Sequence, residues 1–350
     1  MENKKVLIGM SGGVDSSVAV ALLQDAGHHC CGCNLLLADS QSPEDAHLAA
    51  SRFGIRLLVL DFQDQFRCHV QDRFAEVYEG GSTPNPCIDC NRHLKFGAML
   101  EKALELGFDA IATGHYARIS QDPESGRYLL SKAADRAKDQ TYFLYMLTQH
   151  QLSHTLFPLG GLTKDQVRSI AQEQGLLNAR KRDSQDICFI PGGDYAAFLE
   201  SYRNKAYPSG DFLDTQGNVV GQHRGAVAYT IGQRKGLGIA LGEPVYVCGK
   251  DMQRNTVTVG PNEALFTDTL WAEDLNWISI PCLSAPLELT AKIRHSQNEQ
   301  PCTVYPEGDL VRVVFQQPQR AVTPGQAVVF YQGDLVAGGG RICRAKNTEV

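Results

Sequence analysis

Residues 5–17 have the sequence KVLIGMSGGVDSS, and this stretch decides the fold class. Residues 5–10 form a short apolar run that predicts a buried strand, and a helical pattern runs from Ser16 to about Asp25. The Gly/Ser-rich turn between them lets backbone N–H groups face an anion at the positive end of the helix. The stretch therefore predicts a phosphate-binding turn after the first strand of an α/β sheet.

Strand and helix patterns alternate over the next hundred residues. Further strands are predicted at 29–37, 57–61 and 110–113, and further helices at 43–53, 63–78 and 96–106. Strands alternating with helices of this length form a parallel sheet with helices on both faces. Ligands of such sheets bind beyond the carboxyl ends of the strands, which is where the Gly/Ser-rich turn falls.

The character of the chain changes near residue 207. From there, short β-rich runs are punctuated by Gly and Pro, and helical periodicity is absent. A length of 350 residues also exceeds one ordinary core. We expect a catalytic α/β domain over 1–205, a small central β-rich domain over 206–267 and a C-terminal β-barrel-like domain over 268–350.

Composition sets limits on the location and partners of the protein. With 43% hydrophobic and 21% charged residues, the chain is typical of soluble globular proteins, and no apolar run is long enough to span a membrane. The N-terminus shows no signal-peptide core, which predicts a cytoplasmic protein. The net charge of −6 argues weakly against nucleic acid. Basic runs at 180–182 and 234–235 are usually solvated faces, but they could also supply a local positive surface.

The chemistry of the Gly/Ser-rich turn narrows the reaction. Ser11, Ser16 and Ser17 can donate to phosphate oxygens, whereas Asp15 would repel them unless a cation intervened, which predicts a bridging Mg²⁺. The turn lacks the lysine of P-loop NTPases, so transfer of the γ-phosphate is not implied. It resembles the SGGxDS loop of ATP pyrophosphatases (the PP-loop family), which split ATP into AMP and pyrophosphate. The alternative is a βα turn without a ligand.

Most of the eleven cysteines should be small buried residues, since a disulfide framework is not expected in the cytoplasm. Cys87 and Cys90 differ, because they form a C-x-x-C motif in a Pro-rich polar segment that predicts a loop. Such a pair suits a redox couple, half a zinc site or part of an iron–sulfur site. Basic residues follow Cys90, among them Lys95, and others precede Cys188. They predict an electropositive setting that would lower the pKa of these thiols.

Several motifs together resemble the tRNA-specific 2-thiouridylase (MnmA) family. In chain order they are residues 11–17, TPNPCIDCNRHLKFG (83–97), ATGHYA (112–117), KDQTYFLY (138–145), DICFI (186–190), TIGQRKGLG (230–238) and AVTPGQ (321–326). The match covers nearly the whole chain. It implies a PP-loop fold and ATP-dependent thiolation of C2 of the wobble uridine in tRNAs for Lys, Glu and Gln.

The resemblance also implies roles for individual residues. Cys90 would be the nucleophile, and Cys188 would carry a persulfide loaded by a relay protein or a cysteine desulfurase. The residues implied for ATP binding are Gly9, Met10, Ser11, Gly12, Gly13, Val14, Asp15, Ser16, Leu35 and Gly114. Those implied for contact with tRNA are Asn85, Pro86, Cys87, His115, Lys138, Asp139, Gln140, Arg294, His295 and Gln326.

One residue departs from the family pattern. Many members have an Asp, given an acid/base role, where this chain has Cys87. Either Cys87 or a water then moves the proton, or the chemistry differs. A third thiolate beside Cys90 and Cys188 also allows a 4Fe–4S cluster, with its fourth iron open to a sulfide. Two rival functions are a PP-loop amidotransferase, which would not need the cysteines, and a non-catalytic tRNA-binding protein, which would not need the SGGVDSS loop.

Overall fold

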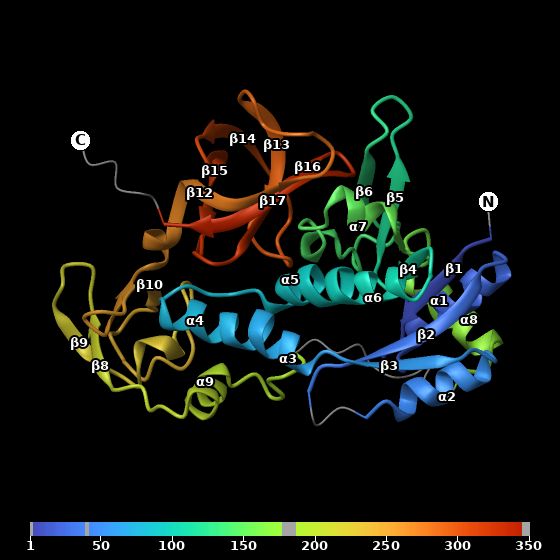
Figure 1. The fold of residues 1–350 in the computed structure, drawn as a ribbon. Coiled ribbons are helices and arrows are strands. Elements are labelled where there is room, and N and C mark those ends of the chain that lie inside the picture. The colour runs from blue at the N-terminus through green and yellow to red at the C-terminus, as the bar shows by residue number, and fades with distance from the viewer. Residues whose placement is uncertain (1–2, 39–41, 177–186, 345–350) are drawn as a thin grey trace.

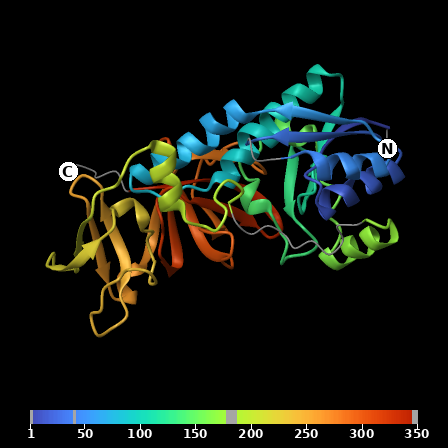
Figure 2. The same cartoon turned by 90° about the horizontal axis from the view of Figure 1, so that it is seen from below.

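A computed structural model of the chain describes residues 3–38, 42–176 and 187–344. It contains a five-stranded sheet, a four-stranded sheet and an eight-stranded sheet. In the two views of Figures 1 and 2 the barrel formed by the largest sheet lies between the other two units, with the N-terminal α/β unit at one end. The prediction of a parallel α/β unit followed by β-rich units is confirmed.

The N-terminal sheet is parallel throughout, with strand order β3-β2-β1-β4-β7. Its strands are β1 (Lys5–Gly9), β2 (His29–Leu36), β3 (Leu57–Asp61), β4 (Ala110–Ala112) and β7 (Thr155–Leu156). Side chains of a strand alternate between the faces of the sheet. Accordingly, Val6 and Ile8 pack in one core cluster with residues of α1 (Val14–Asp25), α2 (Glu44–Arg52) and α8 (Lys164–Glu173), whereas Leu7 packs in a second cluster on the other face.

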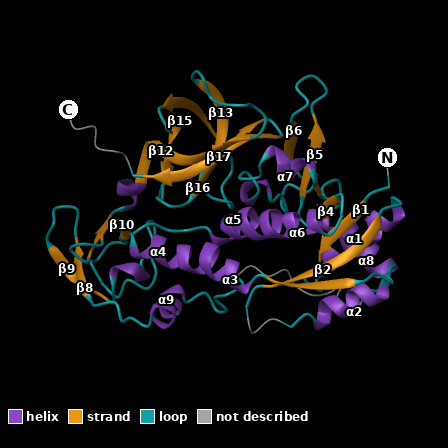
Figure 3. Cartoon of the chain, viewed as in Figure 1, coloured by secondary structure: helices purple, strands orange, loops and turns teal. Residues whose placement is uncertain are grey.

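Two helical rods run below the barrel, and Figure 3 shows them in purple beneath its strands. The first contains α3 (Gln63–Phe66), a π-helical segment Arg67–Asp72 and α4 (Arg73–Glu79). The second contains α5 (Pro86–Cys90), a π-helical segment Asn91–Ala98 and α6 (Met99–Glu105). The prediction that the C-x-x-C motif lies in a loop was therefore wrong. Proline fits the first turn of a helix, where its missing N–H is not needed, so Pro86 starts the helix instead of preventing it.

The β-rich part of the chain forms two separate sheets. The smaller has the order β10-β11-β8-β9 and contains β8 (Gly210–Leu213), β9 (Val219–His223), β10 (Tyr246–Asp251) and β11 (Thr256–Gly260). The barrel contains β12 (Phe266–Trp277), β13 (Leu287–Lys292), β14 (Gln300–Glu307), β15 (Leu310–Arg320), β16 (Ala327–Gln332) and β17 (Leu335–Cys343). It closes because β12 pairs with both β15 and β17.

The barrel and the α/β unit are joined more closely than the sequence predicts. The hairpin β5 (Ala117–Gln121) and β6 (Tyr128–Lys132) comes from the first part of the chain, yet it extends the barrel sheet through the pairing of Ser131 with Leu335. Leu7 of β1 and Tyr331 of β16 also belong to one buried cluster. This shared core fixes the two units against each other, while the boundaries near residues 205 and 268 stay predictions.

Shorter elements connect these units. They are the helices α7 (Gln149–Ser153) and α9 (Tyr195–Arg203) and the 3₁₀ turns Thr141–Phe143, Ala226–Ala228 and Asn262–Leu265. Within the described ranges, no helix has both the length and the apolar character needed to cross a membrane.

Candidate active site

A cavity of about 520 Å³ opens beside the Gly/Ser-rich turn, at the carboxyl ends of β1, β2 and β4. This is the edge at which parallel sheets bind ligands. The residues predicted for ATP that line it are Gly9, Met10, Ser11, Asp15, Ser16, Leu35 and Gly114, and two predicted tRNA contacts, His115 and Gln140, line it as well. Gly12, Gly13 and Val14 complete the turn and begin α1.

Two glycines allow this turn to pack closely. Gly12 has φ +73°, and a Cβ there would lie 2.3 Å from Cβ of Asp45. A Cβ at Gly114 would lie 2.9 Å from the backbone carbonyl carbon of Asp15. Because real Cβ contacts are longer than this, both positions require glycine, and the loop after β4 lies directly on the phosphate turn.

The carboxylate of Asp15 already has a cationic partner. Lys164 Nζ, at the start of α8, lies 2.9 Å from each carboxylate oxygen, and the Tyr116 hydroxyl donates to Oδ1 at 2.9 Å. The side chain of Lys164 is only 8% exposed, so the pair lies largely away from solvent. The sequence predicts that a cation must offset the negative charge of Asp15. In the structure, Lys164 of the same chain provides such a cation.

The three candidate cysteines lie close enough to affect one another's titration. Cys87 is exposed and Cys90 buried on α5, while Cys188 is exposed in the loop before α9. Burial, together with the like charges of Cys188 and Cys87, raises the pKa of Cys90 to about 11 against the lowering effect of Lys95. Cys188 and Cys87 keep an exposed edge, yet the loss of solvent around their sulfur atoms likewise raises their pKa.

The predicted lowering of the thiol pKa values was therefore wrong in direction. Desolvation outweighs the nearby positive charge, and Arg92 pairs with Asp274 of the barrel at 2.9 Å. The basic run at 180–182 lies outside the described residues. In the described part of the chain, no group of three or more His, Cys, Asp or Glu side chains is arranged to hold a metal ion.

The barrel holds the segment that leads into α5. Gln326 Nε2 donates to the carbonyl oxygens of Thr83 and Pro84 at 3.2 and 3.0 Å, and Thr83 N donates to Pro324 O at 2.8 Å. Gly325, with φ +92°, lies so close that a Cβ would be 2.8 Å from Thr83 O. Gln326, predicted to contact tRNA, thus positions α5, the helix that carries Cys87 and Cys90.

Several other residues predicted to contact tRNA are held by contacts within the chain. His295 Nε2 lies 3.1 Å from Asp139 O, and Arg294 donates to Arg320 O. The Asp139 carboxylate is buried and accepts from Thr141 Oγ1 at 2.6 Å and from the Ala133 backbone. Asn85 lies just before α5 and Pro86 is buried within it, while Lys138 lies beside Asp139.

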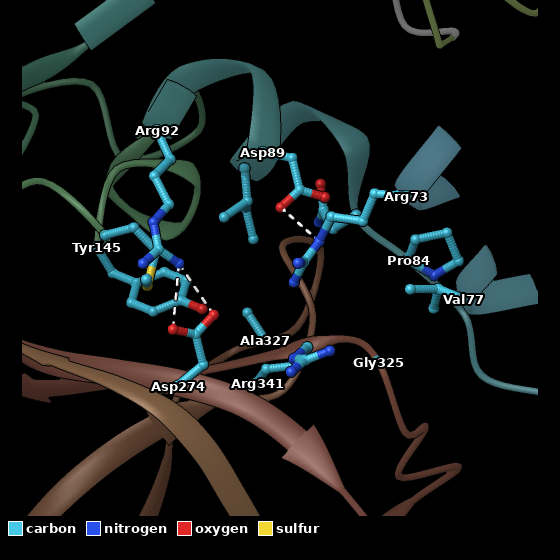
Figure 4. A pocket seen from close by; sticks show the side chains of 13 residues that line it. Arg73, Val77, Pro84, Asp89, Arg92, Tyr145, Asp274, Gly325, Ala327 and Arg341 are labelled. Carbon is cyan, nitrogen blue, oxygen red and sulfur yellow. Dashed lines mark hydrogen bonds and ion pairs between the residues drawn. The ribbon is translucent and has the colours of Figure 1, made fainter. Parts of the chain in front are cut away.

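A second, small cavity of about 30 Å³ lies between α5 and the barrel. Figure 4 shows Asp89 and Arg92 reaching into it from the helical rod that carries the cysteines. Asp274 and Arg341 reach into it from the barrel strands. Asp89 Oδ1 is 3.1 Å from Arg73 Nε. Burial nevertheless raises the pKa of Asp89 to about 6, against the lowering effect of three arginines, Arg73, Arg92 and Arg341. Asp89, one of the two residues between Cys87 and Cys90, thus faces the barrel across this cavity.

The raised pKa of Asp89 predicts a specific pH dependence of stability. Between about pH 4 and 6 the folded state holds a proton that the unfolded state has lost, so this contribution to stability falls as the pH rises through about 6. We expect the free energy of unfolding of the native chain to fall by about 2 kcal/mol relative to Asp89→Asn between pH 4 and 7. Urea titrations across this range measure it. Asp309→Asn, in an exposed turn, is the matched control, and parallel curves for the native chain and Asp89→Asn would contradict the prediction.

Family models match three consecutive parts of the chain. They describe a tRNA methyl transferase HUP domain over residues 4–192, a tRNA methyl transferase PRC-barrel domain over 196–261 and an aminomethyltransferase beta-barrel domain over 267–342. The tRNA-specific 2-thiouridylase MnmA of Acetivibrio thermocellus is 50% identical over 98% of this chain and 100% of its own length. The corresponding protein of Symbiobacterium thermophilum is 51% identical over 98% of this chain and 93% of its own. The chain belongs to the tRNA-specific 2-thiouridylase family.

Membership of the 2-thiouridylase family confirms the resemblance inferred from the motifs, and it implies ATP as cofactor and tRNA as substrate. Among solved structures, a 4-thiouridine synthetase–RNA complex with bound ATP aligns at TM-score 0.38 and 18% identity, over 57% of this chain and 50% of that one. That similarity is too weak to support any conclusion.

Two contacts in this 2-thiouridylase site were not predicted from the sequence. Lys164 and Tyr116 hold Asp15, although they lie far from it in the chain. Thr163 and Gln166 form a capping box, and that pattern indicates where α8 begins. The capping box does not indicate that the side chain of Lys164, the first helical residue, points toward the Gly/Ser-rich turn.

Proposed function

We propose that this chain catalyses the ATP-dependent 2-thiolation of the wobble uridine in tRNAs for Lys, Glu and Gln. The observation that supports this most is the proximity of two chemical sites. Lys95 lines the cavity beside the phosphate turn and also acts electrostatically on Cys87, Cys90 and Cys188. An activated base held at the cavity would therefore lie next to the thiols. Because the substrate is tRNA, we place the enzyme in the cytoplasm.

The first half-reaction activates the base. The C2 oxygen of uracil attacks the α-phosphate of ATP, pyrophosphate leaves, and the oxygen becomes part of an adenylate that departs later as AMP. The Gly/Ser-rich turn would hold the phosphates through its N–H groups. We propose Mg²⁺ as a further cofactor at Asp15, whose carboxylate supplies the hard oxygen ligands that Mg²⁺ prefers and which would offset phosphate charge when bound.

The second half-reaction delivers sulfur. A relay protein or cysteine desulfurase would load Cys188 as a persulfide. The Cys90 thiolate attacks the inner sulfur, so a Cys90–Cys188 disulfide forms and hydrosulfide leaves. Hydrosulfide attacks C2, AMP departs, and loss of one proton leaves the thiocarbonyl. An external dithiol must then reduce the disulfide. The target base must leave its stack, which costs little in an anticodon loop.

A 4Fe–4S cluster on Cys87, Cys90 and Cys188 is the alternative route for sulfur. Thiolates are the appropriate ligands, and these three are near neighbours. In their described arrangement, however, they do not form a group that could hold a metal ion. Anaerobic purification with iron and sulfide quantification decides between the routes. Four irons per chain, lost together with activity in Cys87→Ala, would support the cluster, whereas full activity without iron would exclude it.

The function itself is tested by product analysis. With ATP, a sulfur donor and substrate tRNA, we expect pyrophosphate, AMP and 2-thiouridine in equal amounts, the last by mass analysis of nucleosides. An amidotransferase would release AMP without tRNA, and a non-catalytic binder would release none. Failure to form 2-thiouridine from any tRNA for Lys, Glu or Gln would refute the proposal.

Affinity for tRNA should fall steeply with salt despite the net charge of −6. Counterion release makes log K fall linearly with log salt, with a slope that follows the number of phosphates neutralised. Arg234 and Lys235 are exposed in the central unit. Replacing both with Gln should lower the slope by about one to two. Binding titrations at four salt concentrations measure it, and a flat dependence in the native chain would show that the basic residues are merely solvated.

A further inference from the structure

One lysine lies where the nucleotide cavity and the cysteines meet. Lys95 lines the same cavity as Ser11 and Asp15, and it is half-buried. It belongs to the π-helical segment Asn91–Ala98, which directly follows Cys90. The family resemblance assigns it no role.

The π-helical turn brings Lys95 to the side of the helix that carries Cys90. Each backbone hydrogen bond of a π-helix spans five residues, so residues i and i+5 lie on roughly the same side. In an α-helix, the same spacing would turn Lys95 about 140° away from Cys90. π-Helical turns inside helices often occur at functional sites, because they change which side chains share a face.

Few charged residues line the cavity, and Lys95 is one of them. Among the described residues that line the cavity, Lys95 is the only lysine or arginine, and Asp15 is the only acid. Asp15 is engaged by Lys164. His115 is neutral, since burial and the charge of Lys95 hold its pKa well below its usual range. The triphosphate of ATP would therefore meet one uncompensated cation in this wall.

We infer that Lys95 is a further catalytic residue, whose ammonium group binds the α-phosphate of ATP. It would thus stabilise the negative charge on the phosphoryl group under attack in the first half-reaction. The inference deepens the proposed thiolation and rests on it only for the identity of the reaction.

The phosphate contact is tested by calorimetric titration with AMP and with adenosine, which differ only in the α-phosphate. We expect Lys95→Gln to weaken AMP binding about tenfold and to leave adenosine binding unchanged. Lys95→Arg, which keeps the charge, should stay within about threefold of the native chain. Lys102→Gln removes a charge from a partly exposed position on α6 and is the matched control. Equal AMP affinities in the native chain and Lys95→Gln would overturn the phosphate contact. The titration uses neither tRNA nor a sulfur donor, so a failure here is separate from a failure to form 2-thiouridine.

Discussion

Cys188→Ser and Cys90→Ser should each lower tRNA thiolation by about 10³-fold or more, whereas ATP binding should stay close to that of the native chain. The reason is that each variant removes a sulfur atom that the transfer step requires, and a hydroxyl cannot carry a persulfide or form a disulfide. Neither residue lines the cavity beside the phosphate turn in the described structure. Mass analysis of tRNA nucleosides after incubation with ATP and a sulfur donor measures the loss.

The two half-reactions separate in these variants. Adenylation releases pyrophosphate, while AMP leaves only when sulfur displaces it. We therefore expect a burst of about one pyrophosphate per enzyme–tRNA complex without the matching AMP. Cys68→Ser replaces an exposed thiol on the neighbouring helical rod and should behave as the native chain does. Native rates of thiolation in either Cys188→Ser or Cys90→Ser would refute the persulfide relay.

Cys87→Ser distinguishes the routes for sulfur. If Cys87 only moves a proton, serine or a water should leave partial activity. If Cys87 holds iron, activity and iron should be lost together. The exposed position of Cys87 on α5 is compatible with either role.

Local patterns predicted the α/β unit well, because each of its elements has its own signal in the chain. Strand β3 has the predicted bounds, Leu57–Asp61, and β1 and β2 each end one residue before the predicted limit. The cysteine segment was misjudged because prolines were taken to exclude a helix. Here Pro86 occupies the first helical turn, where its ring is tolerated.

The predicted electrostatics failed for a different reason. Sequence proximity shows which charges lie near a thiol, but it does not show how far water is excluded. At Cys90 the loss of solvent outweighs the nearby Lys95. Arg92, two residues after Cys90, contributes to the contact with the barrel through Asp274. Long-range contacts such as Gln326 with Thr83 and Lys164 with Asp15 are set by the packing of separate units, and no local pattern encodes them.

Asp15→Asn should lower the formation of pyrophosphate and AMP by about 10²-fold or more, because the variant loses the carboxylate that would hold Mg²⁺ against the phosphates. The structure adds a second cost. Lys164 is almost buried, and the variant removes its carboxylate partner, so the fold should lose about 1–3 kcal/mol of stability. Urea titration and a pyrophosphate assay measure the two effects separately.

The double variant Asp15→Asn/Lys164→Met assigns the role of Asp15. It removes the buried charge together with its partner, so stability should return most of the way to that of the native chain. If Asp15 holds Mg²⁺, the double variant stays inactive, and pyrophosphate formation in Lys164→Met still rises with added Mg²⁺. If Asp15 serves only to neutralise Lys164, adenylation recovers with stability. Recovery of adenylation in the double variant would therefore exclude Asp15 as the magnesium ligand and leave the phosphates to the backbone of the Gly/Ser-rich turn and to Lys95.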